Sequence, residues 1–261
     1  MSNRESRNRR KVSAYVIAYN EAEKLPETLA SLSWVDEIVV ADSYSTDETA
    51  SIALAHGAKV VQITFSGFGA LRNEAVMHCE HDWIFSLDSD ERCTPEVAKE
   101  ILCILGSEAP CDAYLVPRRN FFMGRWIRHS GWYPNFRQPQ FFHRAALTYD
   151  NLPVHEGYIL KEGAHLCRLN NAIWQIPFGD VGEVLRKADR YSSLGSTKIT
   201  QPRITLFTAL SHASWAFLKH YVFKLGFLDG SPGFVIAFGN FEGTFYRYLK
   251  AMETQASGWK K

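Results

Sequence analysis

The fold is decided by residues 12–42, VSAYVIAYNEAEKLPETLASLSWVDEIVVAD. Residues 12–18 and 37–41 are short apolar runs rich in β-branched side chains, which is typical of buried strands, and leucines recur at helical spacing in residues 24–32 between them. A strand that leads to the next strand through a helix is joined to it by a crossover, and crossovers join parallel strands. These residues therefore predict the first β-α-β unit of a parallel sheet.

The same alternation continues to about residue 105. We expect strands at residues 59–63 and 81–87, and helices at residues 47–56, 67–79 and 95–105. Ser45 and Glu48 form a capping-box pattern before the first of these helices, Gly57 is expected to end it, and Thr94 is expected to cap the last helix. The alternation predicts a largely parallel sheet with helices on both faces, whose ligands bind beyond the carboxyl ends of the strands.

The second half of the chain follows another pattern. After residue 112, short strand-like pieces rich in aromatic residues and arginine replace the long helices, until a helix is expected from Val181. Residues 204–225 and 234–249 again have helical spacing, with a stripe of aromatic and leucine side chains. We therefore predict one large α/β domain with a helical C-terminal region.

The bulk composition excludes several classes of protein. Lys and Arg number 29 against 28 Asp and Glu, a net charge of +1, so no overall charge attracts nucleic acid. The five cysteines include no C-x-x-C pair, and we expect reduced, structural thiols. The basic N-terminus is not followed by the apolar run of a signal peptide, and no apolar stretch is long enough to cross a bilayer. A cytoplasmic protein is expected.

The strongest chemical signal is Asp88-Ser89-Asp90, directly after an apolar strand. Two carboxylates at alternate positions can hold a hard divalent cation, Mg²⁺ or Mn²⁺, which neutralises a nucleotide diphosphate as it departs. A solvated acidic loop produces the same three letters. The position at the end of the fourth predicted strand favours the metal-binding interpretation.

Other polar residues follow or flank the same strands. Asp42 ends the second strand and can accept a hydrogen bond from a pyrimidine N3–H, although an Asx-turn is an equal alternative. Asn20 and Glu21 follow the first strand, where they flank a base or ribose or simply lead into a helix. Arg72 on the third helix can meet a phosphate with its planar guanidinium, or lie on a solvated helix face.

These motifs together resemble a known family. Ala18-Tyr19-Asn20-Glu21, Asp42-Ser43-Tyr44-Ser45-Thr46-Asp47, Arg72-Asn73, Asp88-Ser89-Asp90-Glu91-Arg92 and Val154-His155-Glu156 occur in the order seen in glycosyltransferase family 2, which has the GT-A fold. The resemblance is nearest to the bacterial lipopolysaccharide inner-core β-1,4-glucosyltransferases, and Gly226-Phe227-Leu228-Asp229-Gly230 and residues 119–134 extend it over nearly the whole chain. Tyr44 and Glu48 stand where the family usually has glycine.

The resemblance implies roles for individual residues. Asp42 would touch the nucleotide base, Asp88 the ribose or the metal, and Asp90 the metal, with His155 as a further ligand or phosphate contact. Members of the family invert the anomeric centre, which requires a general base near the acceptor hydroxyl. Glu156 is the first candidate for this base and Glu91 the second. The donor site would comprise Tyr19, Asn20, Glu21, Asp42, Arg72, Asp88 and Ser89.

The implied acceptor is a lipid-linked saccharide at the inner leaflet of the membrane. Trp132, Tyr133 and Arg137 are candidates for binding it, and Arg128, Arg137 and Arg144 could meet its phosphate groups. Core aromatics with surface arginines would give the same pattern. The tail's aromatic stripe with Lys219, His220, Lys224, Arg247 and Lys250 suits a helix lying in the membrane interface, or ordinary packing on the catalytic domain.

The domain organisation follows from this interpretation. A basic, flexible N-terminus is expected at residues 1–11, a GT-A catalytic domain at 12–200, divided into a nucleotide-sugar half (12–110) and an acceptor half (111–200), and an amphipathic helical region at 201–261.

Four other functions are to be compared with this one. A haloacid-dehalogenase phosphatase has its paired aspartates after the first strand rather than the fourth, and a nucleotide-binding oxidoreductase would need a G-x-G-x-x-G motif that is absent here. A non-catalytic sugar-nucleotide binding module, or a polyprenyl-phosphate glycosyltransferase of the same fold, would share most of these motifs.

Overall fold

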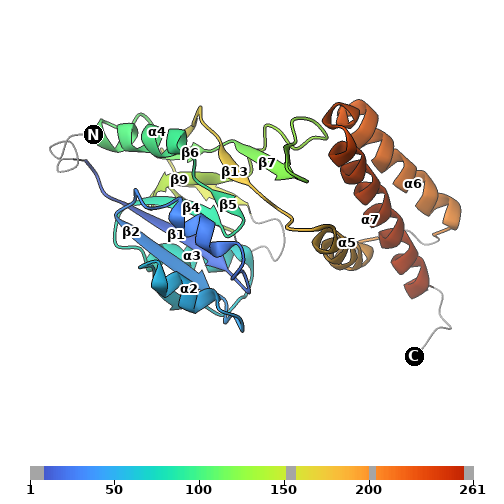
Figure 1. Cartoon of the computed structure of the whole chain (residues 1–261), viewed down its shortest axis with the longest axis horizontal. Helices are drawn as coiled ribbons and strands as arrows, with labels where there is room; N and C mark the ends of the chain where they lie inside the picture. Colours follow the sequence, from blue (N-terminus) through green and yellow to red (C-terminus); the bar gives the residue numbers. More distant parts are fainter. Residues whose placement is uncertain (1–8, 151–156, 200–203, 256–261) are drawn as a thin grey trace. The chain divides into compact units, whose positions relative to one another are not determined.

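The computed structural model describes residues 9–150, 157–199 and 204–255, which form two compact units (Figure 1). The first unit contains the chain up to Arg118 together with Asn135–Gln175, and the second contains Arg119–Pro134 together with the chain from Ile176 onward. The units thus divide at Gln175, with residues 119–134 assigned to the second, whereas the sequence led us to expect one boundary at residue 200. Each unit is described separately below.

A seven-stranded sheet forms the centre of the first unit. Its order is β12-β6-β9-β4-β1-β2-β3, and β4, β1, β2 and β3 run parallel, as predicted. β9 lies antiparallel between β4 and β6, so the sheet is mixed. The strands are β1 (Val12–Ala18), β2 (Glu37–Asp42), β3 (Lys59–Gln62), β4 (Trp83–Asp88), β6 (Ala113–Leu115), β9 (Pro139–His143) and β12 (Leu166–Arg168).

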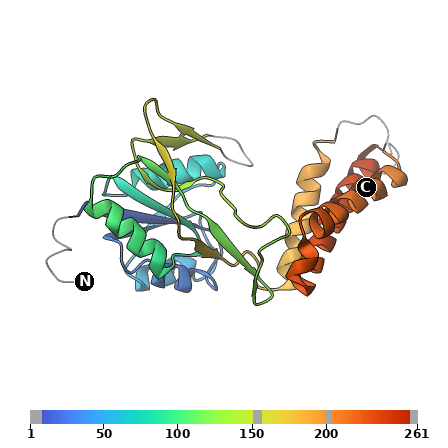
Figure 2. The same ribbon diagram turned by 90° about the horizontal axis from the view of Figure 1, so that it is seen from above.

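Helices cover both faces of this sheet (Figure 2). Alternate residues of β1 point to opposite faces, so Val16 joins one apolar cluster and Tyr15 the other. The cluster around Val16 includes α1 (Leu25–Ala30), α2 (Thr49–Ala55) and α4 (Pro95–Gly106), and the cluster around Tyr15 includes α3 (Phe68–Met77). The expected two-sided α/β architecture is confirmed.

The helix boundaries were predicted with mixed success. Thr94 caps α4 by accepting a hydrogen bond from the backbone N–H of Val97, and Gly57 has φ +75° just after α2, both as expected. The capping box at Ser45 is wrong. The N-cap of α2 is Glu48, which makes no side-chain capping bond, and the Ser45 hydroxyl instead donates to Asp42.

Smaller elements complete the first unit. β5 (Glu91–Arg92) pairs antiparallel with β13 (Ile173–Gln175), and β10 (Leu147–Tyr149) pairs antiparallel with β11 (Tyr158–Leu160). Cys111 and Cys167 form a disulfide, which corrects the expectation that all five cysteines are reduced thiols. Cys167 lies in β12, and Cys111 lies just before β6, the parallel partner of β12, so strand pairing brings the two residues together.

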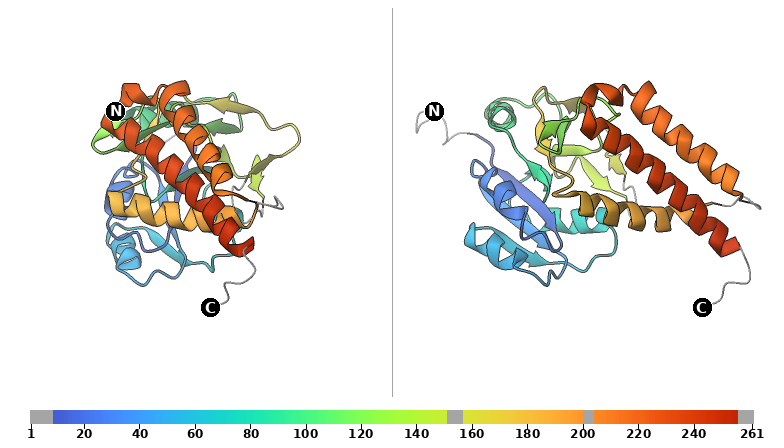
Figure 3. Two further views of the ribbon diagram at one scale, coloured as in Figure 1. Left: turned by 90° about the vertical axis from the view of Figure 1, so that its right-hand side faces the viewer. Right: turned by 45° about the vertical axis from the view of Figure 1, so that its right-hand side comes forward.

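In its described residues, the second unit combines a β-hairpin with three α-helices. Phe122 and Ile127 of the hairpin pack with Ile236 in a small apolar core. Figure 3 shows α6 and α7 lying side by side, and no helix among the described residues is long and apolar enough to cross a bilayer. The elements are β7 (Arg118–Phe122), β8 (Arg125–Trp126), α5 (Val181–Ser196), α6 (Leu206–Leu218), a π-helical turn (Lys219–Phe223), a 3-10 turn (Gly226–Asp229) and α7 (Ser231–Gln255).

Candidate active site

The carboxylates of Asp88 and Asp42 flank the end of β1. In the sheet register Asp88 of β4 lies opposite Ile17, and Asp42 of β2 lies opposite Ala18. Two strand spacings separate β4 from β2, about 10 Å. This confirms the prediction that the polar residues after these strands gather at one edge of the sheet.

Asp88 is held by a buried arginine. Arg72 of α3 is only 3% exposed, and its guanidinium donates to Oδ1 of Asp88 at 2.7 Å and to the Ser86 hydroxyl at 3.2 Å. The alternative of a solvated helix face is therefore wrong for Arg72. Among the described residues no hydrogen bond reaches Oδ2 of Asp88, so this oxygen is available to a ligand. Burial alone would raise the pKa of Asp88, but Arg72, and then Arg118, lower it, which keeps the carboxylate ionised.

Glu91 lies beneath this turn, fully buried. One of its oxygens accepts from Nε of Arg118, and the other accepts from the backbone N–H of Asp88 at 3.0 Å and from the Gln140 amide at 2.7 Å. Burial raises the pKa of Glu91, and the neighbouring Asp88 adds to the rise while Arg118 opposes it. Both oxygens are occupied, so this arrangement fixes the turn rather than presenting a carboxylate to solvent.

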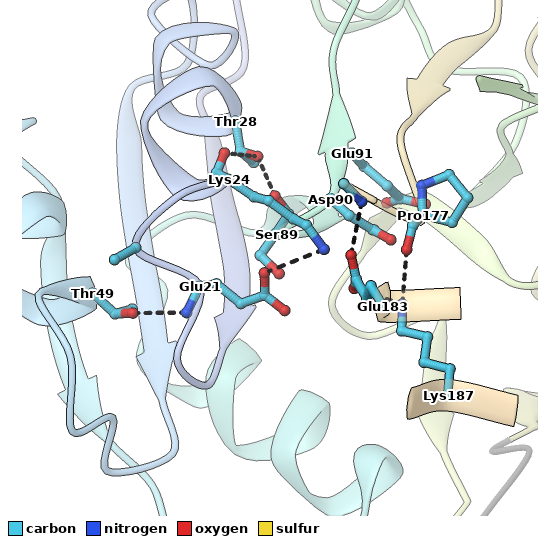
Figure 4. Close-up of polar contacts among 12 residues, drawn as sticks. Glu21, Lys24, Thr28, Thr49, Ser89, Asp90, Glu91, Pro177, Glu183 and Lys187 are labelled. Carbon is cyan, nitrogen blue, oxygen red and sulfur yellow. Dashed lines mark hydrogen bonds and ion pairs between the residues drawn. The ribbon is translucent and has the colours of Figure 1, made fainter. Parts of the chain in front are cut away.

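The turn itself is anchored from two further sides. The backbone carbonyl of Ser89, a buried residue, accepts a hydrogen bond of 2.6 Å from the Thr28 hydroxyl of α1 (Figure 4). Asp90 is partly exposed and accepts from the side-chain amide of Gln175 on β13 at 3.2 Å. Thr28, Gln140 and Gln175 gave no sequence signal, because strand pairing and helix packing bring them here from distant parts of the chain.

The carboxylates of Asp88 and Asp90 fit a hard divalent cation. Mg²⁺ and Mn²⁺ favour carboxylate oxygens, and Mg²⁺ in particular is commonly held by one or two carboxylates together with substrate phosphates and waters. Within the described residues no cluster of three or more acidic, histidine or cysteine side chains forms a complete cage, so a cation here would depend on such additional ligands. His155 and Glu156, the expected further ligand and first candidate base, lie outside the described residues.

The loop after β2 is built around Asp42. This carboxylate is fully buried and accepts from the backbone N–H of Ser45 and from the Gln62 amide at 2.8 Å, which is the turn geometry that the sequence left open as an alternative. Tyr44 has φ +59° and an exposed ring. A left-handed backbone at this position explains why a glycine is favoured there.

The loop after β1 packs against the same turn. Oδ1 of Asn20 accepts from the backbone N–H of Thr46 at 2.8 Å, and Tyr19 beside it is exposed. The backbone N–H of Glu21 donates to the Thr49 hydroxyl, while its carboxylate lies 3.9 Å from Lys24 (Figure 4). Asn20 and Glu21 thus join the loops after β1 and β2 into one surface.

The expected acceptor residues are divided between the two units. In the second unit, Trp132 packs against Phe122 and Phe178, and Tyr133 remains partly exposed. Arg137 belongs to the first unit, is exposed, and contributes to lowering the pKa of Asp88. Arg144 donates to the backbone carbonyls of three residues, Val76, Cys79 and His81, so it is a structural residue rather than the phosphate contact we had considered.

Solved structures share this architecture. S. aureus TarS in complex with UDP is 17% identical, covers 96% of this chain and 93% of its own, and superimposes with a TM-score of 0.51. The TarS complex with UDP-GlcNAc gives 18% identity and a TM-score of 0.50 over 94% of this chain and 89% of that one. At this identity the likeness establishes the fold alone.

Curated relatives match nearly the full length. An uncharacterized glycosyltransferase of Rickettsia felis is 26% identical over 94% of this chain and 90% of its own. The lipopolysaccharide core biosynthesis glycosyltransferase LpsC of Rhizobium meliloti is 25% identical over 87% of this chain and 89% of its own. The profile of glycosyl transferase family 2 matches residues 13–159, more than half of the chain, from β1 through the Asp88-Ser89-Asp90 turn and beyond. The chain therefore belongs to glycosyl transferase family 2 and is a glycosyltransferase.

Proposed function

We propose that this glycosyltransferase moves a hexose, with glucose the expected sugar, from a UDP-linked donor to a saccharide hydroxyl with inversion at the anomeric carbon. The observation that carries the proposal is the Asp88-Ser89-Asp90 turn. Arg72 holds one oxygen of Asp88 and leaves Oδ2 for a ligand, while Gln175 orients Asp90. A bound Mg²⁺ or Mn²⁺ would neutralise the charge that develops on the departing diphosphate.

The remaining donor contacts follow from the sheet edge. Asp42 lies two strands from Asp88, a separation that suits a nucleoside with its base toward β2 and its diphosphate toward β4. Asn20 and Glu21 shape the loop between these positions, with exposed Tyr19 beside them. Asp42 is fully buried, and both of its oxygens already accept hydrogen bonds from Ser45 and Gln62. Recognition of the base by Asp42 therefore requires one of these bonds to be exchanged for a bond from the base N–H.

The general base is proposed to be Glu156. Inversion in a single displacement needs a carboxylate that takes the acceptor proton as the sugar is attacked. Glu91 is less suited to this task, because Arg118, Gln140 and the backbone of Asp88 occupy both of its oxygens. We assign Glu91 the role of positioning the Asp88 turn.

The acceptor is proposed to be a lipid-linked saccharide, such as a lipopolysaccharide inner core. The full-length similarity to LpsC supports this choice over a polyprenyl-phosphate acceptor. The protein would then work at the cytoplasmic face of the inner membrane. In support, Phe207, Trp215 and Leu218 of α6 are exposed on the side opposite buried Ala209 and Ala213. Residues 204–228 contain no acidic residue, and Lys219 is exposed among them, which suits an anionic surface.

The basic tail residues do not all contribute to such a surface. Lys250 pairs with Asp189 at 2.6 Å and also donates to two serines of α5, and Nδ1 of His220 donates to the carbonyl of Ser130. Arg247 lies over the ring of Tyr248. These three residues serve packing within the second unit, so Lys219 and Lys224 remain as the candidates for lipid contact.

A thermal-shift titration tests the donor site. UDP with Mn²⁺ should raise the melting temperature of the wild-type protein, because a ligand that binds only the folded state stabilises it in proportion to RT ln(1 + [L]/Kd). Asp90→Ala should remove the Mn²⁺-dependent part of this shift. Asp82→Ala is the matched control, since Asp82 is a well-exposed carboxylate just before β4. An unchanged Mn²⁺-dependent shift in Asp90→Ala would contradict the assignment.

The choice of base is tested separately. Glu156→Gln should keep UDP binding and lower kcat by about 10²- to 10⁴-fold, the usual contribution of a general base. Glu91→Gln should instead weaken UDP binding and lower stability, because the buried Arg118 loses its carboxylate. A variant Glu156→Gln with wild-type kcat would show that the base is another residue.

A further inference from the structure

A tight hairpin in the second unit presents two arginines side by side. β7 and β8 pair Phe121 with Trp126, and Met123-Gly124 between the strands have φ +50° and +72°, as a two-residue type I′ turn requires. The backbone N–H of Ile127 donates to the carbonyl of Asn120 at 2.9 Å, which extends the pairing by one residue. The next pair in this register is Arg119 with Arg128.

Both guanidiniums rest on the same indole. Cζ of Arg119 lies 4.7 Å and Cζ of Arg128 lies 4.4 Å from the centroid of the Trp126 ring. In a strand, alternate residues share a face, so Arg119 and Arg128 lie on the same face of the hairpin as Trp126. Stacking on an aromatic ring attracts each cation and restricts its motion, while its N–H groups stay directed to the sides.

No carboxylate among the described residues forms an ion pair that would neutralise the charge of these two arginines. Like charges directly opposite each other on a hairpin are destabilising, and neither Arg119 nor Arg128 forms an ion pair with a carboxylate anywhere in the described residues. The acidic side chain of Asp229 contacts this loop; it is buried and accepts from the backbone N–H groups of Arg128 and His129 and from the Ser130 hydroxyl. Its hydrogen-bonding capacity is used to hold the loop.

The surroundings of the pair are rigid. Ile127 between Trp126 and Arg128 is fully buried in the apolar core of the unit, and the Asn120 amide donates to the carbonyl of Trp132 at 2.8 Å. Partly exposed Tyr133 meets the Trp126 ring edge-on at 5.3 Å. Nε1 of Trp126 is buried and, within the described residues, has no acceptor. Two exposed arginines held beside the partly exposed ring of Tyr133 can bind an anionic sugar.

We propose that Arg119 and Arg128 bind a phosphate or carboxylate substituent of the saccharide acceptor, with the ring of Tyr133 against the sugar. A planar guanidinium can donate two parallel hydrogen bonds to the oxygens of a phosphate or carboxylate group. A neutral sugar has no such group. This inference rests on the proposed function, because it takes the bound sugar to be the acceptor. The site itself belongs to the second unit and uses none of the carboxylates assigned to the donor.

The test follows the indole N–H resonance of Trp126 by NMR, identified by its loss in Trp126→Phe. Glucose 6-phosphate should shift this resonance saturably, and glucose at the same concentrations should not. In Arg119→Gln/Arg128→Gln the apparent affinity for glucose 6-phosphate should fall at least tenfold. Arg125→Gln is the matched control, because Arg125 is an exposed arginine of the same hairpin whose guanidinium donates to the carbonyl of Leu228.

The outcomes separate this inference from the proposed function. UDP binding with Mn²⁺ should be the same in Trp126→Phe, in Arg119→Gln/Arg128→Gln and in Arg125→Gln. A failure of the proposed donor site would therefore leave the result for glucose 6-phosphate unaffected. The inference is overturned if glucose 6-phosphate gives no saturable shift, or the same shift in the double variant. A response to phosphatidylglycerol vesicles without a response to glucose 6-phosphate would assign the pair to a lipid headgroup and would also overturn it.

Discussion

Arg72 shows how a single buried charge organises the donor edge. Its guanidinium is buried against Asp88 and Ser86, and removing one partner of such a pair leaves the other charge uncompensated. Arg72→Met should therefore lower the free energy of unfolding by about 3–5 kcal/mol, measured by urea denaturation. The double variant Arg72→Met/Asp88→Asn should recover part of this loss. Equal stability of the single and double variants would show that the pair does not interact as described.

Asp36 links stability to acid pH. Although burial raises its pKa, hydrogen bonds from Arg9 at 2.7 Å and from the backbone N–H of Val12 at 2.9 Å lower it below the ordinary 3.8. The stabilisation by ionised Asp36 is therefore complete well above pH 3.8 and is lost as the pH falls through the lowered pKa. Asp36→Asn should cost about 1–2 kcal/mol at pH 7. Urea denaturation from pH 7 to pH 3 should show the two proteins converging, and a constant difference would contradict the linkage.

The cysteines should differ in reactivity. Burial raises the pKa of Cys79 and of Cys93 to about 12, whereas Cys103 is exposed. Because the thiolate is the reactive species, iodoacetamide at pH 8 should label Cys103 alone in the native, unreduced protein. After reduction, the partly exposed Cys167 should become available as well. Mass spectrometry of the peptides reads out both results, and labelling of Cys167 without reductant would argue against the disulfide.

At the scale of elements, we expect substitutions at two neighbouring positions of the β7–β8 turn to have opposite effects on stability. Both residues need φ > 0, which asparagine and glycine adopt most readily. Met123→Asn should therefore raise stability by a few tenths of a kcal/mol, and Gly124→Ala should lower it by about 1 kcal/mol, although open space surrounds Gly124. Thermal unfolding followed by tryptophan fluorescence compares the two variants. A loss of stability in Met123→Asn would contradict the assigned turn.

The elements that the sequence predicts well are those with long, regular patterns. β1 to β4 and α1 to α4 were expected within a few residues, because each is an apolar run or a helical stripe bounded by polar residues. β9 lies in the half of the chain where we expected short strand-like pieces, but its antiparallel insertion between β4 and β6 was not expected, since its partners are set by long-range packing. Ser45 was misassigned because a hydroxyl near a helix start can bond to a neighbouring carboxylate as well as to the helix.

The candidate site also contains some residues whose positions the sequence predicts and others whose positions it does not. Asp42, Asp88 and Asp90 could be predicted because strand ends gather at one edge of a parallel sheet. The contacts of Arg118, Gln140 and Gln175 with this turn could not be predicted. These residues lie in later strands that carry no motif, and only strand pairing brings them to the turn. The Arg119–Arg128 pair also needed the hairpin register, which only the folded turn reveals.

At the scale of the whole molecule, the outward face of α6 predicts binding to anionic membranes. Phe207→Glu/Trp215→Glu should reduce cosedimentation with phosphatidylglycerol vesicles at least tenfold, since each ring contributes roughly 1.5–3 kcal/mol when buried. Leu54→Glu is the matched control, because Leu54 is a similarly exposed apolar residue on α2 of the first unit. Equal binding of the wild type and the double variant would leave this face without a role at the membrane.

The division into two units also has a consequence for biosynthesis. The hairpin residues Phe122 and Ile127 pack against Ile236. The backbone N–H of Arg128 donates to Asp229, which lies 101 residues later in the sequence. At about 5–20 residues per second, a ribosome adds these partners roughly 5–20 s after the hairpin. During that interval the first unit can already assemble its central parallel strands, while the hairpin's apolar side chains still lack their partners. A chaperone that binds nascent chains should therefore contact residues 119–134 longer than the central strands.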